Sequence, residues 1–133
     1  MGILIDTNIL IEAEKERIVL TEKIQGRKDD QGFVSVITAS ELLHGVWRAT
    51  NLRIRTKRSA FVEAILKQFP ILPIDLQIVR KHAQIWAELK SKGTVIGLHD
   101  TWIAATCLVH QHTLATTNVR EFNRIQGLQV ECW

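Results

Sequence analysis

Short apolar runs alternate along the chain with longer stretches whose apolar residues recur every three or four positions. The first run, Ile3-Leu4-Ile5, is continuous and stops at Asp6, as in a strand buried on both faces of a parallel sheet. Further strands are predicted at residues 33–37, 71–74, 113–116 and 128–132. Strands separated by helices favour right-handed crossovers, so the pattern predicts one α/β domain over residues 1–133, with three layers and a parallel sheet in the middle.

Helical spacing predicts helices at residues 9–13, 19–27, 38–50, 52–69, 76–92 and 101–110, and a short one after Asn118, with a turn at residues 28–32. Pro73 cannot donate to a ladder, so the strand at residues 71–74 belongs at a sheet edge. Thr38-x-x-Glu41 has capping-box spacing, and Asp100 is expected to open the helix that follows it. The helix after Asp75 is expected to bury an apolar stripe made of Val79, His82, Ala83, Trp86 and Leu89.

The composition supports a folded domain. Hydrophobic residues make up 46% of the 133 residues and charged residues 23%, which excludes a disordered chain. No apolar run approaches the ~20 residues that cross a bilayer, and the first residues lack the basic flank of a signal peptide, so we expect a cytoplasmic protein without a membrane segment. Cys107 and Cys132 match no metal spacing and are expected to be free thiols.

The formal net charge of +3 says little by itself, but the positive charges are unevenly distributed. Residues 48–58 contain no acidic residue, and they carry the basic residues Arg48, Arg53, Arg55, Lys57 and Arg58. Such a run is either an ordinary solvated helix face or a surface that binds phosphates or an acidic partner. The sequence leaves both interpretations open.

Polar residues stand where an apolar run or a loop meets a helix, at Asp6, Glu41, Asp100 and Asn118. Taken singly, each is more commonly a helix cap than a ligand. Taken together they predict one acidic pocket, because the carboxyl ends of neighbouring parallel strands share an edge of the sheet. Carboxylates so close together raise one another's pKa, and a hard cation such as Mg²⁺ or Mn²⁺ relieves the repulsion. A water bound to that ion would attack a phosphodiester.

Four segments carry a family resemblance. They are Ile3-Leu4-Ile5-Asp6-Thr7-Asn8, Thr38-Ala39-Ser40-Glu41-Leu42, Ile96-Gly97-Leu98-His99-Asp100-Thr101-Trp102-Ile103-Ala104-Ala105 and Thr116-Thr117-Asn118-Val119-Arg120-Glu121-Phe122. In this order they resemble the signature segments of PIN-domain ribonucleases, in particular the VapC-type toxins of toxin–antitoxin pairs. The resemblance implies a five-stranded parallel sheet, a divalent metal, RNA as substrate, a VapB-like antitoxin and a homodimer.

The resemblance also implies roles for individual residues. By position, Asp6 and Asp100 look like direct metal ligands, and Glu41 looks like the third acid, which binds metal or orients the attacking water. Supporting polar positions match Asn8, Thr116 and Asn118. Many relatives place an acid where this chain has Asn118, so the resemblance favours either a single metal ion or a second ion that the substrate recruits over two firmly bound ions. His99, which adjoins Asp100, is a further candidate for the pocket.

Three other classes of protein were weighed. A phosphorelay receiver also gathers acids at strand ends, but it needs paired acids after the first strand and a lysine ending the last, and neither is present. A dinucleotide-binding module needs a glycine-rich turn after the first strand, where this chain has Asp6-Thr7-Asn8. A non-catalytic binding module with an acidic pocket is disfavoured because Asp6, Glu41 and Asp100 are all present.

Overall fold

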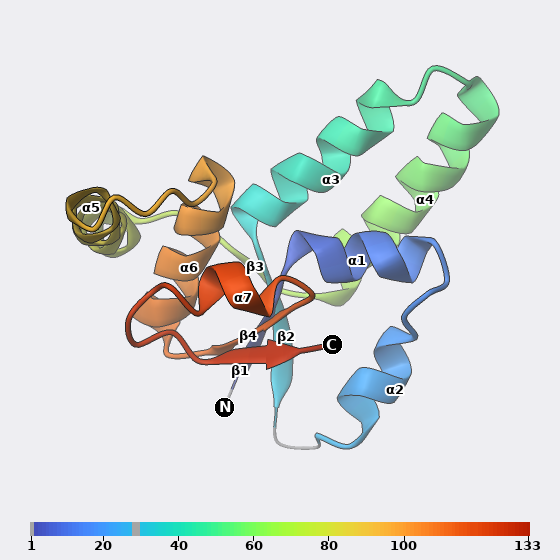
Figure 1. Ribbon diagram of the computed structural model, residues 1–133. Helices are drawn as coiled ribbons and strands as arrows, with labels where there is room; N and C mark the ends of the chain where they lie inside the picture. Colours follow the sequence, from blue (N-terminus) through green and yellow to red (C-terminus); the bar gives the residue numbers. More distant parts are fainter. Residues whose placement is uncertain (1, 28–29) are drawn as a thin grey trace.

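A computed structural model describes residues 2–27 and 30–133 and shows a sheet between two layers of helices (Figure 1). The sheet has five strands in the order β3-β2-β1-β4-β5, and every neighbouring pair is parallel. The strands are β1 (Gly2–Ile5), β2 (Gln31–Ser35), β3 (Ile71–Leu72), β4 (Thr113–Thr116) and β5 (Val130–Cys132). The helices in the described ranges are α1 (Thr7–Glu14), α2 (Leu20–Gln25), α3 (Val36–Arg48), α4 (Leu52–Gln68), α5 (Leu76–Ser91), α6 (Leu98–His110) and α7 (Val119–Phe122).

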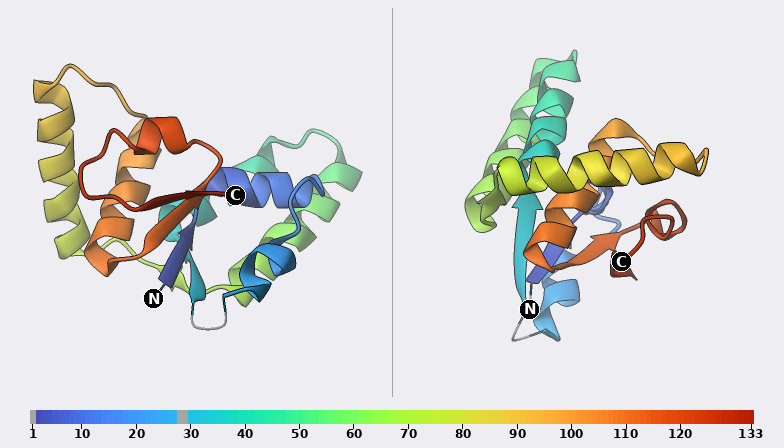
Figure 2. Two further views of the ribbon diagram at one scale, coloured as in Figure 1. Left: turned by 60° about the horizontal axis from the view of Figure 1, so that its bottom comes forward. Right: turned by 90° about the vertical axis from the view of Figure 1, so that its left-hand side faces the viewer.

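Strand β1 lies at the centre of the sheet because its side chains are apolar on both faces. Ile3 and Ile5 pack with residues of α1, α3 and α4, whereas Leu4 packs on the opposite face with residues of α5 and α6. Figure 2 shows these two groups of helices on opposite sides of the sheet. The carboxyl ends of β1, β2 and β4 therefore share one edge, where α1, α3 and α7 begin.

The predicted fold class is confirmed, with a five-stranded parallel sheet in a three-layer α/β/α arrangement and the short strand β3 at an edge. Cys107 is buried, Cys132 is exposed, and both thiols are free. Among the described helices, none is long and apolar enough to cross a bilayer. Of the predicted turn at residues 28–32, residues 28–29 lie outside the described ranges, and the prediction is wrong for Gln31 and Gly32, which belong to β2.

Two predicted helix starts are wrong. Strand β2 ends at Ser35, whose side chain accepts a hydrogen bond of 3.1 Å from the Ile37 backbone N–H and so caps α3. Thr38 therefore lies inside α3 and is fully buried, so Thr38 and Glu41 form no capping box. Helix α6 begins at Leu98 after Gly97, which leaves Asp100 in its first turn instead of at its cap.

The stripe predicted for α5 is also partly wrong. His82 and Leu89 are buried as expected, but the other buried residues of this helix are Ile78 and Ile85. The expected core residues Val79, Ala83 and Trp86 are exposed instead, and the Trp86 side chain is 58% exposed. Two apolar stripes one position apart run along α5, and packing against α6 selects the one with the two isoleucines.

Candidate active site

Asp6 caps α1 directly after the central strand, and it is 2% exposed. Its Oδ1 accepts a hydrogen bond of 2.9 Å from the Thr7 backbone N–H, and its Oδ2 accepts one of 2.7 Å from the Thr116 hydroxyl. Burial raises the pKa of Asp6, the two hydrogen bonds oppose that rise, and repulsion from Glu41 and Glu121 adds to it. The sheet thus holds a carboxyl group that a nearby positive charge would stabilise in its ionised form.

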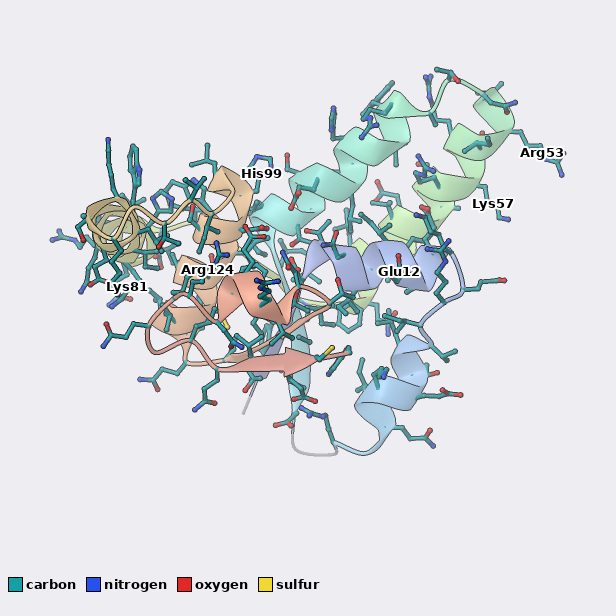
Figure 3. All side chains as sticks on the ribbon, viewed as in Figure 1. Glu12, Arg53, Lys57, Lys81, His99 and Arg124 are labelled. Atoms are coloured by element: carbon teal, nitrogen blue, oxygen red, sulfur yellow. The ribbon has the colours of Figure 1, made fainter. Side chains whose placement is uncertain are left out.

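Glu41 approaches Asp6 from the second turn of α3. Its Oε1 accepts a hydrogen bond of 2.8 Å from the Thr7 hydroxyl. Its Oε2 lies 3.5 Å from Nδ1 of His99, which extends from the first turn of α6 toward the start of α3 (Figure 3). Glu41 therefore stands between the element that carries Asp6 and the element that carries Asp100.

Asp100 shows the electrostatics of the cluster most clearly. Its pKa is raised from 3.8 to about 6, first by burial and then by repulsion from Asp6, Glu121 and Glu41, against a smaller opposing effect of His99. Asp6 follows β1, Glu121 lies on α7 and Glu41 lies on α3, so residues far apart in the sequence act on the ionisation of Asp100. The structure therefore brings Asp6 and Glu41 close enough to Asp100 to raise its pKa.

Thr116 and Asn118 support the site through hydrogen bonds. The Thr116 hydroxyl donates to Asp6 and accepts a hydrogen bond of 2.9 Å from the Asn118 backbone N–H. The Asn118 side chain caps no backbone group, and its Nδ2 donates to Oε2 of Glu121 at 2.6 Å. Glu121 was missed as a site residue, because its spacing from Asn118 indicates a capping box equally well. This glutamate supplies a fourth carboxylate from one turn further along α7.

A groove of about 480 Å³ adjoins Glu41 and runs between α1 and the α3–α4 hairpin. Asn8 is exposed and lines this groove instead of contacting the buried carboxylates. Apolar side chains of Ile11, Leu42 and Val62 lie along the groove, and Arg48 and Arg58 lie among its lining residues. The groove therefore joins an acidic site to basic side chains.

The five basic residues of the hairpin fall into two groups. Arg55 donates to the Ala49 carbonyl at 2.7 Å and stacks on Trp47, and Arg58 donates to Glu14 and to the Gly45 carbonyl. These two arginines bind the hairpin together and to α1. The exposed members are Arg48, Arg53 and Lys57. Figure 3 shows Arg53 and Lys57 extending away from the body of the protein.

The carboxylates fit a hard divalent cation by their chemistry. They are oxygen donors, they repel one another, and burial disfavours the charged forms of Asp6 and Asp100. Within residues 2–27 and 30–133, no three acidic, histidine or cysteine side chains are gathered as a ready-made metal cage. Mg²⁺ commonly uses only one or two carboxylates and completes its shell with water, so it does not require such a cage.

Comparisons with known proteins agree with this geometry. The PIN domain family matches residues 3–128. The chain is 40% identical to ribonuclease VapC1 of Rickettsia felis, over 98% of this chain and 95% of the relative, and 30% identical to the tRNA(fMet)-specific endonuclease VapC of Salmonella typhimurium, over 98% and 96%. It also matches a chain in a crystal structure of DNA-bound VapBC from Salmonella typhimurium, with a TM-score of 0.90 and 30% identity over 100% of this chain and 98% of that one.

Proposed function

This chain belongs to the PIN-domain family, among the VapC ribonuclease toxins of toxin–antitoxin pairs, and from that premise we propose that it hydrolyses phosphodiester bonds of RNA at Asp6, Glu41 and Asp100. The observation that carries this proposal is the position of Glu41, which accepts a hydrogen bond from Thr7 beside Asp6 and lies 3.5 Å from His99 beside Asp100; the pKa of Asp100, raised to about 6, agrees with this arrangement. A fold keeps such a cluster at a cost in stability, which a bound cation would offset.

PIN-domain nucleases are generally metal-dependent, and the donor set here fits that chemistry. We propose Mg²⁺ or Mn²⁺ as the ion, held by Asp6 and Asp100 with Glu41 beside them. When bound, the ion would act as a Lewis acid that offsets charge on the reacting phosphate. Asn118 has an amide at a position where an acidic side chain could hold a second ion. Glu121 supplies a carboxylate nearby, but that carboxylate accepts a hydrogen bond from Asn118. One firmly held ion therefore remains the proposal.

The chain's own residues have distinct proposed roles. Glu41 accepts a hydrogen bond from the attacking water and so orients it toward the phosphorus. Thr116 and the Thr7 backbone N–H hold the two oxygens of Asp6 in place at 2.7 and 2.9 Å. Asn8 and the groove beside Glu41 are proposed to contact the RNA strand next to the scissile bond.

The partners proposed for this chain follow from its relatives and its surface. Solved relatives are VapBC complexes, and we propose a VapB-like antitoxin that covers the groove and excludes RNA. The exposed residues Arg48, Arg53 and Lys57 would contact phosphates or antitoxin acids. The exposed stripe of α5, with Leu76, Val79 and Trp86, is the surface we propose for a homodimer. We propose that the protein acts in the cytoplasm, where its RNA substrate would be found.

Cleavage of RNA by Asp6→Asn and Asp100→Asn proteins tests the proposal. Both substitutions keep side-chain size but remove a metal-binding charge, so cleavage in Mg²⁺ or Mn²⁺ should fall to the level seen with a chelator. Asp75→Asn is the matched control, because Asp75 only caps α5 through a 2.9 Å hydrogen bond to the Ile78 N–H, and asparagine caps equally well. Near-normal cleavage by either site variant, measured on end-labelled RNA, would remove the proposed mechanism.

A further inference from the structure

The hydroxyl of Thr7 lies between two side chains of α3. Its Oγ1 is 2.8 Å from Oε1 of Glu41 and 2.9 Å from Oγ1 of Thr38. Thr7 is 5% exposed and Thr38 is fully buried, so the contact between their hydroxyls is buried, whereas the contact with Glu41 is partly buried at the edge of the groove. The Thr7 hydroxyl therefore links two side chains that are distant in the sequence, Glu41 at 34 positions and Thr38 at 31 positions.

Chemistry sets the direction of the hydrogen bonds in this chain. A carboxylate can only accept, so the single hydroxyl proton of Thr7 points to Glu41. The Thr7 oxygen then accepts from the Thr38 hydroxyl. A hydroxyl that already accepts a hydrogen bond is a stronger donor, since hydrogen bonds in series polarise one another. Thr38 thus strengthens and orients the bond from Thr7 to Glu41.

These two threonines differ from Thr56 of α4 and Thr106 of α6. The hydroxyls of Thr56 and Thr106 donate to backbone carbonyls four residues earlier, Leu52 and Trp102, both at 2.9 Å. That local bond is the usual way to satisfy a hydroxyl within a helix. Thr7 and Thr38 instead use their hydroxyls across two elements, and the series ends on a carboxylate of the site.

We propose that Thr7 is a positioning residue for Glu41 and that Thr38 assists it; this inference rests on the function proposed above. The bond from Thr7 fixes Oε1 of Glu41 and leaves Oε2 on the side of His99. A glutamate side chain has several rotatable bonds, and fixing one oxygen selects the conformers that hold the other at the groove. Glu41 is then already oriented when water and substrate arrive.

The test compares Thr7→Val with Thr7→Ser in RNA cleavage. Valine has the shape of threonine and keeps the backbone N–H that binds Asp6, but it has no hydroxyl. Hydrogen bonds to charged groups are strong enough that kcat should fall by roughly tenfold or more in Thr7→Val, with KM little changed. Thr7→Ser restores the hydroxyl and should stay within about threefold of the parent. Thr38→Val should fall between the two, because Thr7 can still donate without it.

Thr106→Val is the matched control, since it removes an equally buried hydroxyl that bonds only its own helix. Its kcat should match that of the parent. Unfolding in urea identifies any variant that loses activity by losing its fold, and Thr7→Ala replaces Thr7→Val if the valine protein does not fold. A Thr7→Val protein with parental kcat would overturn the positioning role, and so would a Thr7→Ser protein as impaired as the valine variant. Either result alongside an inactive Asp6→Asn would leave the nuclease proposal standing.

Discussion

Removal of the Asp100 charge should stabilise the metal-free protein at neutral pH. Asparagine matches the shape of the protonated carboxyl group but carries no charge. The folded protein raises the pKa of Asp100 from 3.8 to about 6, by burial first and then by repulsion from Asp6, Glu121 and Glu41. Ionised Asp100 is therefore a source of strain in the folded state, and Asp100→Asn removes it.

The size of the effect follows from the difference of about 2 pKa units, which at ~1.36 kcal/mol per unit is roughly 3 kcal/mol. Asp100 is only half-buried, so solvent screens part of this energy. The carboxylate also gains ~0.3–1 kcal/mol from its place in the first turn of α6, which asparagine gives up. We expect Asp100→Asn to raise the free energy of unfolding by roughly 1–2 kcal/mol at pH 7.5.

The pH dependence of this gain has a definite sign. Because the folded state binds the Asp100 proton more tightly than the unfolded state, protonation contributes stability below the unfolded pKa of 3.8, and this stability is lost as the pH rises through about 6. The parent protein should therefore lose stability relative to Asp100→Asn between those two values. Near pH 4, where the folded parent is already protonated, the two proteins should be almost equally stable.

Urea unfolding between pH 4 and pH 7.5, in the presence of a chelator, measures this difference. Glu121→Gln is a graded control, because it removes only one of the repelling charges and should give a smaller gain in the same pH range. Saturating Mg²⁺ should stabilise the parent more than Asp100→Asn, since the ion binds the folded state through that carboxylate. A variant less stable than the parent at pH 7.5 without metal would refute the reasoning and make Asp100 a structural helix-terminus residue.

Two further predictions concern the surface. Charge reversal of the exposed pair, Arg53→Glu with Lys57→Glu, should weaken RNA or antitoxin binding and reduce the slope of log K against log salt by about one for each phosphate that is no longer bound. The control, Lys23→Glu on α2, should leave both binding and slope unchanged. Equal slopes for the parent and both variants in binding titrations would show that the tip of the hairpin is ordinary surface. Val79→Lys on the exposed stripe of α5 should convert a dimer to a monomer in light scattering, and an unchanged mass would place any dimer contact elsewhere.

Local patterning was enough to predict the framework of the fold. An uninterrupted apolar run can only be buried on both faces, so the residues from Ile3 to Ile5 identify a central strand, and the structure confirms it at the middle of the sheet. Pro73 correctly placed its strand at an edge. The order of four segments carried the family resemblance. The expectation of one acidic pocket had a separate basis, since parallel strands bring their carboxyl ends to one edge of the sheet.

Where two local patterns in the sequence were equally good, tertiary packing decided which residues are buried and where a helix begins. Helix α5 carries two apolar stripes, and contact with α6 chose Ile78 and Ile85 over Val79 and Trp86. Ser35 caps α3, so the helix cap lies three residues before the expected cap Thr38. Thr38 is instead a buried residue within the helix, beside the site. Sequence alone ranks such alternatives as equal, since each satisfies the same periodicity.

The sequence by itself determined which residues could form an acidic site, namely Asp6, Glu41 and Asp100. Only the tertiary structure decided that Glu121 joins them, that Thr7 bridges to Glu41, and that Arg55 and Arg58 serve the hairpin itself. The physical reason is distance along the chain. Helix and strand periodicity is a property of neighbouring residues, whereas a hydrogen bond such as that from Thr116 to Asp6 joins residues 110 positions apart and requires β1 and β4 to lie side by side.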